Sequence, residues 1–175
     1  MITVETLILP LAFLFLLLLA SSLAWGAVSA APWVPLKSRD LARLLALAEL
    51  KASELVYDLG CGDGRIVVAR LYGVRAIGFE VAILPYCLAK LRVLFSGTGG
   101  FVKIRYKNFW SAPFNQADVV FCFLTPSAMA RLEEKLDHEL KPGARFITYA
   151  FKLPHRSPTL KSQPTANDLP IYLYT

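Results

Sequence analysis

The chain has 175 residues, of which 55% are hydrophobic and 18% charged, and its formal net charge is +6. This length suits one domain and excludes a large multidomain architecture. The sequence holds no basic run interleaved with aromatic residues, no cluster of metal-ligand residues and no Ser/His/Asp set, so it does not favour a nucleic-acid groove, a metal centre or a triad hydrolase.

The N-terminal part of the chain is strongly apolar. No charged residue occurs from Thr6 to Leu36, and the core of this segment, Leu7–Val28, has 22 residues. As a helix it would span about 33 Å, close to the hydrocarbon thickness of a bilayer. The small residues of Ala27–Ala31 leave open a cleaved signal peptide, but Glu5 precedes the apolar run where a secretory signal carries Lys or Arg. We therefore predict a retained transmembrane helix.

Basic residues directly after the anchor indicate its orientation. They are Lys37, Arg39, Arg43 and Lys51. The positive-inside rule then places the rest of the chain in the cytoplasm, as a single-pass membrane protein that contacts the lipid bilayer through this helix. Trp25 and Trp33 would suit the membrane interface. We divide the chain into an anchor and linker, residues 1–36, and a folded domain, residues 37–175.

Strand-like and helix-like segments alternate after the linker Ala31–Pro35. Helices are predicted at residues 38–50, 65–73, 82–95 and from Thr125 onward, and strands at 55–60, 74–80, 101–109, 117–124, 144–151 and 169–175. This alternation predicts an α/β fold, a Rossmann-like doubly wound and mainly parallel sheet of about six strands. The region after Phe151 is short for a final antiparallel hairpin with extra helices, which predicts a minimal lid.

The three cysteines do not form a recognisable framework. Cys61, Cys87 and Cys122 are widely spaced and lie in apolar or turn contexts, so neither a zinc site nor a disulfide is expected. We expect Cys87 and Cys122 to be small core residues. Reduced cysteines agree with a cytoplasmic domain.

The segment "VYDLGCGDGR", Val56–Arg65, places glycines at the end of the first predicted strand. Ligands of doubly wound folds bind at the carboxyl ends of the strands, and Glu80 at the end of the second strand can accept hydrogen bonds from a ribose. The spacing is not the G-x-G-x-x-G of dinucleotide sites, and Asp58 and Asp63 would repel a pyrophosphate. A nucleoside with an ammonium group and no phosphate, such as S-adenosylmethionine, removes this conflict. The alternative is that Asp58 only caps a tight turn.

Three motifs carry a resemblance to a known family. The segments "VYDLGCGDGRIV", "GFE" and "ADVVFCFLTP" resemble the first, second and fourth motifs of class I S-adenosylmethionine-dependent methyltransferases. The chain is most similar to the membrane-anchored lysine methyltransferases that modify the ATP synthase c-subunit and the adenine nucleotide translocase, and to their prokaryotic relatives. That branch also has an N-terminal hydrophobic helix, a short domain and an F-x-x-P-H-type segment, here "FKLPHRSP" at Phe151–Pro158.

The resemblance implies a role for each matching residue. The cofactor-binding residues would be Asp58, Gly60, Cys61 and Gly62 at the methionine end, Glu80 on the ribose, Asn108 and Phe109 beside the adenine, and Phe123 at the floor of the site. Leu124, Thr125 and Pro126 would complete the floor where the acceptor meets the methyl group, and His155 would accept or orient a proton. Relatives often follow the strand-two acid with a D/N-P pair, whereas Glu80 is followed here by "VAILP".

The resemblance also implies the acceptor, a lysine of a membrane-associated protein. A lysine must lose its proton before it attacks, and an apolar mouth lowers its pKa from about 10.4. Candidates for such a mouth, each of which can instead be core, are Phe121, Phe123, Tyr149, Phe151 and Pro154. Two alternatives remain open: a methyltransferase for a small molecule, lipid or quinone, and a non-catalytic S-adenosylmethionine-binding module.

Overall fold

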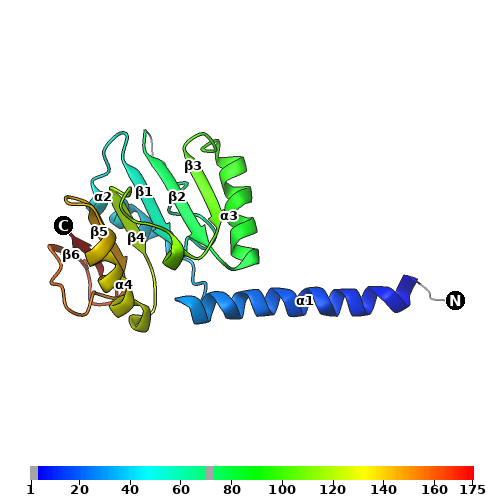
Figure 1. The fold of residues 1–175 in the computed structure, drawn as a ribbon. Helices are drawn as coiled ribbons and strands as arrows, with labels where there is room; N and C mark the ends of the chain where they lie inside the picture. Colours follow the sequence, from blue (N-terminus) through cyan, green and yellow to red (C-terminus); the bar gives the residue numbers. More distant parts are fainter. Residues whose placement is uncertain (1–3, 70–72) are drawn as a thin grey trace.

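The computed structural model describes residues 4–69 and 73–175. Its first element, α1 (Val4–Ser29), is a single apolar helix that projects from the folded domain (Figure 1). Side chains from Leu7 to Leu18 are all exposed, and the helix is long and apolar enough to cross a membrane. The helix predicted over Leu7–Val28 is therefore present, with Pro10 nearly two turns inside it.

The domain is built on one sheet of seven described strands in the order β3-β2-β1-β4-β5-β7-β6. Their bounds are β1 (Leu55–Leu59), β2 (Arg75–Glu80), β3 (Val102–Tyr106), β4 (Val119–Cys122), β5 (Arg145–Tyr149), β6 (Leu160–Ser162) and β7 (Ile171–Tyr174). The first five strands pair in parallel, and the chain reverses direction between the β1–β2 and β1–β4 crossovers. The predicted doubly wound, mainly parallel fold is confirmed, and its switch point lies at the end of β1.

The C-terminal segment forms a hairpin that the sequence did not lead us to expect. β7 pairs antiparallel with β5, and β6 pairs antiparallel with β7. The region was expected to be too short for a hairpin with extra helices; the hairpin is present, so that part of the expectation is wrong, and the sheet has seven described strands rather than about six. A strand of three residues is enough to cover the edge of β7, because each residue in the pair satisfies backbone groups that would otherwise be unpaired.

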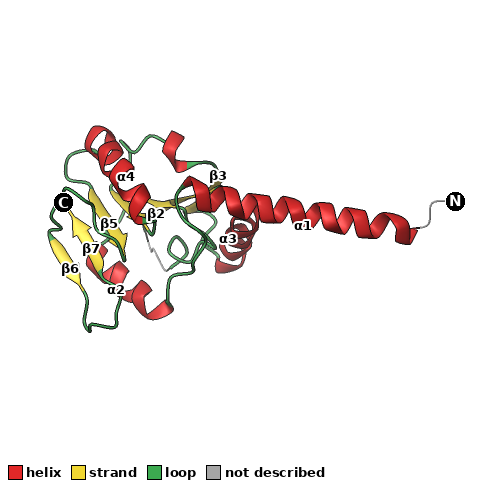
Figure 2. Ribbon diagram, turned by 90° about the horizontal axis from the view of Figure 1, so that it is seen from below, coloured by secondary structure: helices red, strands yellow, loops and turns green. Residues whose placement is uncertain are grey.

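Helices cover both faces of the sheet (Figure 2). α2 (Ser38–Ala48) and α3 (Ile83–Ser96) pack on one face through buried residues such as Leu44 and Ala89. α4 (Pro126–Glu139) packs on the other face through Leu132 and Leu136, near the short 3₁₀ helix η1 (Phe109–Ser111). Pro126 is the first residue of α4, as its fixed backbone angle favours.

The helix predicted at residues 65–73 is absent from the described part of that segment. Arg65–Ala69 form successive turns, with one bond from Val68 N to Gly64 O and one from Ala69 N to Ile66 O, while residues 70–72 lie outside the described residues. The β-branched run that begins at Ile66 disfavours a helix, and the core draws its side chains inward. The described part of the expected helix is therefore a buried turn.

The three cysteines are free, and they differ in exposure. Cys61 and Cys122 are buried, whereas Cys87 is exposed on α3. The expectation that Cys87 is a core residue is wrong, because α3 packs on the sheet through Pro85 and Ala89 and turns Cys87 away from it.

A buried carboxylate joins α2 to the end of the sheet. Asp40, 1% exposed, accepts hydrogen bonds from Arg43 Nη1 at 2.8 Å and from the hydroxyl of Tyr149 at 2.6 Å. Arg43 Nη2 also donates to the carbonyl oxygens of Ser162, at 2.6 Å, and Leu169, at 3.3 Å. One arginine therefore holds α2, β5 and the β6–β7 hairpin together.

Replacing this arginine should unfold the domain more easily. Arg43→Met removes the cation at 2.8 Å from the buried carboxylate of Asp40 and leaves only Arg39 Nε at 3.8 Å, so we expect a loss of about 2–4 kcal/mol in the free energy of unfolding. Arg39→Met, on the same helix, removes a guanidinium that is 61% exposed and should cost less than about 0.5 kcal/mol. Denaturant unfolding of the full chain in micelles, followed by circular dichroism, measures both; equal effects would contradict the role of Arg43.

Candidate cofactor and acceptor cleft

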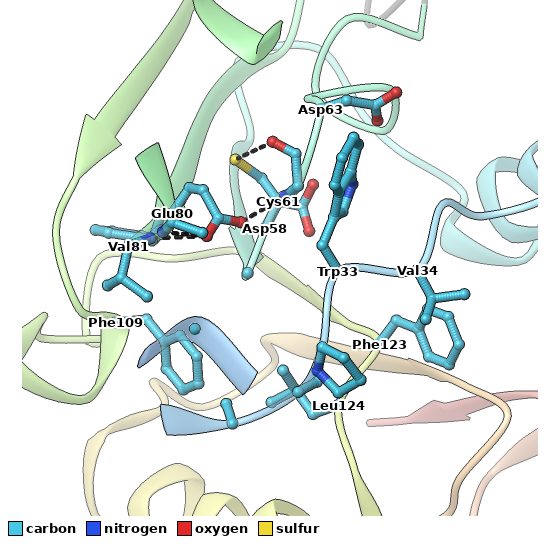
Figure 3. Close-up of a pocket in the computed structure, with 18 of the residues that line it drawn as sticks. Trp33, Val34, Asp58, Cys61, Asp63, Glu80, Val81, Phe109, Phe123 and Leu124 are labelled. Carbon is cyan, nitrogen blue, oxygen red and sulfur yellow. Dashed lines mark hydrogen bonds between the residues drawn. The ribbon is translucent and has the colours of Figure 1, made fainter. Parts of the chain in front are cut away.

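A cleft lies at the carboxyl ends of β1, β2 and β4 (Figure 3). It encloses ≈ 850 Å³ of space outside the protein atoms, its open mouth included. Three segments line the cleft: the glycine loop at residues 60–65, the strand ends, and the end of α1 with the linker at residues 23–36. This is the position at which ligands of doubly wound folds bind.

Asp58 is the buried carboxyl group of the cleft. It lies near the end of β1, is 2% exposed, and its Oδ2 atom has no hydrogen-bond partner among the residues that the structure describes. Burial, and then the negative charges of Glu80 and Asp63, raise the pKa of Asp58 from 3.8 to about 8. A buried acceptor without a partner is costly, so the site is complementary to a cationic donor. The alternative that Asp58 caps the glycine turn receives no support from its contacts.

Glu80 is held in place by backbone donors. Its Oε1 accepts from the N–H groups of Val81 and Ala82 at 2.8 Å each, and its Oε2 accepts from Gly62 N at 2.9 Å (Figure 3). These three bonds fix both carboxylate oxygens and join the end of β2 to the glycine loop. Carboxylate oxygens keep further lone pairs, so Glu80 is still able to accept hydrogen bonds from a ribose.

Asp63 belongs to the frame of the glycine loop. Both its oxygens bond Arg65, at 2.9 and 2.7 Å, and Arg92 Nη2 of α3 lies 2.7 Å from Oδ2. Burial opposes ionisation, but hydrogen bonding and charge from Arg65 and the charge of Arg92 prevail and lower the pKa of Asp63. Its charge is therefore already neutralised, unlike that of Asp58.

Trp33 in the linker is a cleft residue that sequence reasoning missed. We expected it at a membrane interface, but its indole lies over the glycine loop (Figure 3). A Cβ atom added to Gly62, whose φ is +55°, would stand 2.8 Å from Trp33 Cδ1, so only glycine fits beneath the ring. The indole Nε1 is buried without a partner among the described residues. The signal in the sequence was an aromatic residue between two prolines. The segment was interpreted as a linker, and no contact with the glycine loop was predicted.

All eight predicted cofactor-binding residues line this one cleft: Asp58, Gly60, Cys61, Gly62, Glu80, Asn108, Phe109 and Phe123. Asn108 accepts a hydrogen bond from Trp110 N at 3.0 Å, which holds the side chain at the start of η1. The structure thus brings the set together, and the individual roles of its members stay predictions.

The three predicted catalytic residues are not among those that line the cleft. Thr125, just before Pro126 of α4, donates from its hydroxyl to Ala30 O at 2.7 Å and so fastens the linker to the end of β4. His155 has a side chain 83% exposed and its Nδ1 lies 3.0 Å from the buried carboxylate of Glu133. A direct part of Thr125, Pro126 or His155 in the chemistry stays a prediction.

The expected aromatic mouth is smaller than predicted. Phe123 lines the cleft, and Leu124 lies beside it. Phe121 is fully buried in the core and cannot reach the mouth, because β4 is covered on both faces. Tyr149 is buried and directs its hydroxyl to Asp40. Both residues are therefore core, the alternative stated for each of these aromatics.

The cleft fits S-adenosylmethionine better than a dinucleotide. Asp58 presents an unpartnered acceptor for the α-ammonium, Trp33 an unpartnered donor for the α-carboxylate, and Glu80 an anchored carboxylate for the ribose hydroxyls. A pyrophosphate would face the carboxylates of Asp58 and Glu80 in a low dielectric, which is repulsive. Among the described residues, no group of three or more His, Cys, Asp or Glu side chains is placed to hold a metal ion.

The fold and this cleft define a class I S-adenosylmethionine-dependent methyltransferase. A structure of an RNA methyltransferase from Salinibacter ruber in complex with S-adenosyl-L-homocysteine is 29% identical, with a TM-score of 0.76, over 81% of this chain and 92% of that one. A methyltransferase from Thiobacillus denitrificans with the same ligand is 27% identical, with a TM-score of 0.58, over 70% of this chain and 53% of that one.

The chain belongs to the family described by the ANTKMT methyltransferase domain, which matches residues 58–160. A protein-lysine N-methyltransferase of Saccharolobus islandicus is 32% identical over 82% of this chain and 92% of its own length. The lysine N-methyltransferase of the ATP synthase c-subunit from Rattus norvegicus is 35% identical over 73% of this chain. The adenine nucleotide translocase lysine N-methyltransferase of Mus musculus is 36% identical over 73% of it. The chain spans 59% and 56% of the lengths of these two mammalian relatives.

Cofactor binding should depend on pH through Asp58. An ammonium group beside Asp58 lowers its pKa from about 8, so binding releases a proton, and affinity for S-adenosylhomocysteine should rise by up to about tenfold per pH unit between pH 6 and 8. The raised pKa has the opposite effect on the stability of the ligand-free protein. The contribution of Asp58 to the free energy of unfolding is lost as the pH rises from 3.8 to about 8. Calorimetry in buffers of different ionisation enthalpy measures the proton released.

Asp58→Asn provides the control for this pH dependence. The variant should bind S-adenosylhomocysteine weakly and without the slope between about pH 6 and 8, because the amide does not titrate. An unchanged slope in this variant would assign the released proton to another group and contradict the proposed contact.

The indole N–H of Trp33 should contribute to affinity. Trp33→Phe keeps an aromatic ring over Gly62 but removes the donor, and we expect binding of S-adenosylhomocysteine about tenfold weaker, the usual effect of losing a hydrogen bond to a charged group. Trp25→Phe, a change on the exposed face of α1, should leave the affinity unchanged. Equal or tighter binding by Trp33→Phe would mean that the indole occupies space the cofactor needs.

Proposed function

We propose that this protein transfers methyl groups from S-adenosylmethionine to a lysine side chain of a membrane-embedded protein. In this proposal α1 crosses the bilayer once and holds the catalytic domain on the cytoplasmic side, since Lys37 and Arg39 follow the helix and Glu5 precedes it. Family membership supports the reaction, and the relatives named for the ATP synthase c-subunit and the adenine nucleotide translocase support a membrane-protein acceptor.

One structural observation carries the membrane part of the proposal: the end of α1 forms a wall of the cleft. Leu23, Gly26 and Ser29 line it, and Trp110 Nε1 donates to Ser29 O at 2.9 Å. An acceptor near the headgroups would therefore meet the cleft at the place where the anchor leaves the membrane. Tethering of this kind raises the effective concentration of membrane proteins at the site.

The cleft offers the conditions that methylation of an amine needs. S-adenosylmethionine supplies, when bound, a methyl group on a sulfonium. Asp58, Glu80 and Trp33 would hold its two ends, which leaves alignment and exclusion of water as the main tasks of the protein. Phe123, Leu124 and Val34 line the same cleft with apolar surface, and desolvation there lowers the pKa of an entering lysine so that its nitrogen lone pair becomes available.

The reaction should be visible as methyl-lysine in membrane proteins. The full chain, reconstituted in nanodiscs, is incubated with methyl-labelled S-adenosylmethionine and membranes from a source strain that lacks the gene. We expect label in the protein fraction and methyl-lysine after acid hydrolysis. Asp58→Asn should lower the initial rate at limiting cofactor by about a hundredfold, while Arg39→Met should retain it.

The fractionation distinguishes the other acceptors. Label in the lipid extract would replace the proposal by a lipid or quinone methyltransferase. Loss of label after ribonuclease treatment would mean that this protein methylates RNA, the activity named for the Salinibacter ruber structure. Cofactor binding without label in any fraction would indicate a binding module and contradict the proposal.

A further inference from the structure

α3 exposes an apolar face that the folded domain does not cover. Its large exposed side chains are Ile83, Leu84, Leu88, Leu91, Leu94 and Phe95, and the last two are 72% and 81% exposed. Positions 84, 88, 91 and 95 follow the helical spacing and so lie along one side, opposite the buried Pro85 and Ala89. An apolar face of this size on a helix of a soluble domain marks an interaction surface.

The apolar face begins where α1 meets the domain. The hydroxyl of Ser22 accepts from Ile83 N at 2.7 Å, and a Cβ atom added to Gly26 would lie 3.3 Å from Ala82 Cβ. α3 crosses α1 steeply, and the remainder of α1 projects past it (Figures 1 and 2). A bilayer crossed by α1 would therefore have its surface along α3.

The length of α1 brings the bilayer up to α3. Ser22 is the first side chain of α1 that is buried against the domain, and Leu7–Leu18 is exposed throughout. Residues 4–21 span about 27 Å as a helix, close to the hydrocarbon thickness of about 30 Å. The helix thus has no spare length to hold the domain away from the membrane, and the headgroup region begins at the level of Ser22 and Ile83.

The charges around α3 suit anionic headgroups. No Asp or Glu occurs between Glu80 and Asp118, whereas this segment holds five cations: Lys90, Arg92, Lys103, Arg105 and Lys107. All five are exposed, and Arg92 also bonds Asp63. Cations close to an anionic surface are attracted to its headgroups. A helix with one apolar face and basic residues beside it is the pattern of helices that lie in the membrane interface.

We propose that α3 is a second membrane contact: its apolar face, residues 83–95, lies in the headgroup–acyl boundary beside α1, with basic residues of α3 and β3 on anionic headgroups. This inference rests on the proposed crossing of the bilayer by α1. The opposite side of α3 packs on the glycine loop, where a Cβ atom on Gly64 would lie 3.0 Å from Ala89 Cβ and Arg92 bonds Asp63. The bilayer would thus support the helix that braces the cofactor loop.

Native Cys87 provides a probe for this contact. It is exposed on α3 within the apolar face, whereas Cys61 and Cys122 are buried. The full chain is labelled at Cys87 with a small environment-sensitive fluorophore and reconstituted into nanodiscs with or without anionic lipid. We expect blue-shifted emission, quenching by a nitroxide on a shallow acyl position, and loss of quenching by iodide.

Variants separate insertion of the face from other effects. Leu91→Gln with Phe95→Gln should restore iodide quenching at Cys87, whereas Leu160→Gln, an equally exposed leucine on β6 at the other edge of the sheet, should not. The triple change Lys90→Gln, Lys103→Gln and Arg105→Gln should abolish the difference between anionic and neutral nanodiscs. If the triple variant still distinguishes anionic from neutral nanodiscs, these basic residues do not contact the headgroups, and the proposal is contradicted.

A second probe separates failure of this inference from failure of the anchor. Leu14→Cys in a Cys87→Ser background reports on α1. If this probe is quenched by a deep nitroxide while the Cys87 probe stays open to iodide, α1 crosses the bilayer and the α3 contact is wrong. If neither probe meets lipid, the membrane anchoring itself is wrong. A Cys87–Cys87 cross-link that forms only with two copies per nanodisc would assign the face to a dimer and overturn the proposal.

Discussion

The buried carboxylate of Asp58 is the constraint on which the site depends. It lies near the end of β1 in a place where the described residues offer it no cation, with Oδ2 unpartnered and Glu80 nearby. The surrounding residues do not relieve this charge: Asp63 takes both nearby guanidinium groups, and Glu80 takes the backbone donors of the loop. A buried carboxyl group without a partner destabilises the fold. Its presence in the cleft therefore indicates a ligand that bonds to it.

The linker connects this site to α1. Ser29 O and Ala30 O accept from Trp110 and Thr125, and Arg65 of the glycine loop donates to Leu36 O. Between these fixed points Trp33 closes over Gly62. The division into residues 1–36 and 37–175 describes the chain order, yet the contacts make the linker a structural part of the cofactor cleft. Displacement of α1 would therefore move a wall of the site, which ties cofactor binding to the way the domain sits on its anchor.

Short-range patterns in the sequence were enough to predict the features that depend on neighbouring residues. The glycine loop, the acid at the end of β2 and the parallel order of strands all follow from turn chemistry and from alternating apolar segments, and the structure brings their residues together. The contacts by which Trp33 covers the glycine loop and Thr125 holds the linker were missed, because they depend on partners far along the chain, Gly62 in one case and Ala30 in the other. The run after Gly64 was predicted as a helix, but its β-branched residues and their burial in the core make its described part a buried turn. Cys87 and Phe121 show the same limit: an apolar residue does not reveal which side of its element meets the core.

In the proposed membrane contact, the two faces of α3 join the bilayer to the cofactor loop. One face packs on the glycine loop, and the other carries apolar side chains beside α1. A soluble enzyme would gain nothing from exposing them, since burial of each would contribute about 1.5–3 kcal/mol. Contact with a bilayer would recover that energy and would fix the height of the cleft above the hydrocarbon. A lysine presented near the headgroups then needs only to extend along the apolar wall at Phe123 to reach a desolvated position, where its pKa falls and its lone pair becomes available. The same low dielectric that raises the pKa of Asp58 would thus favour the neutral form of the acceptor.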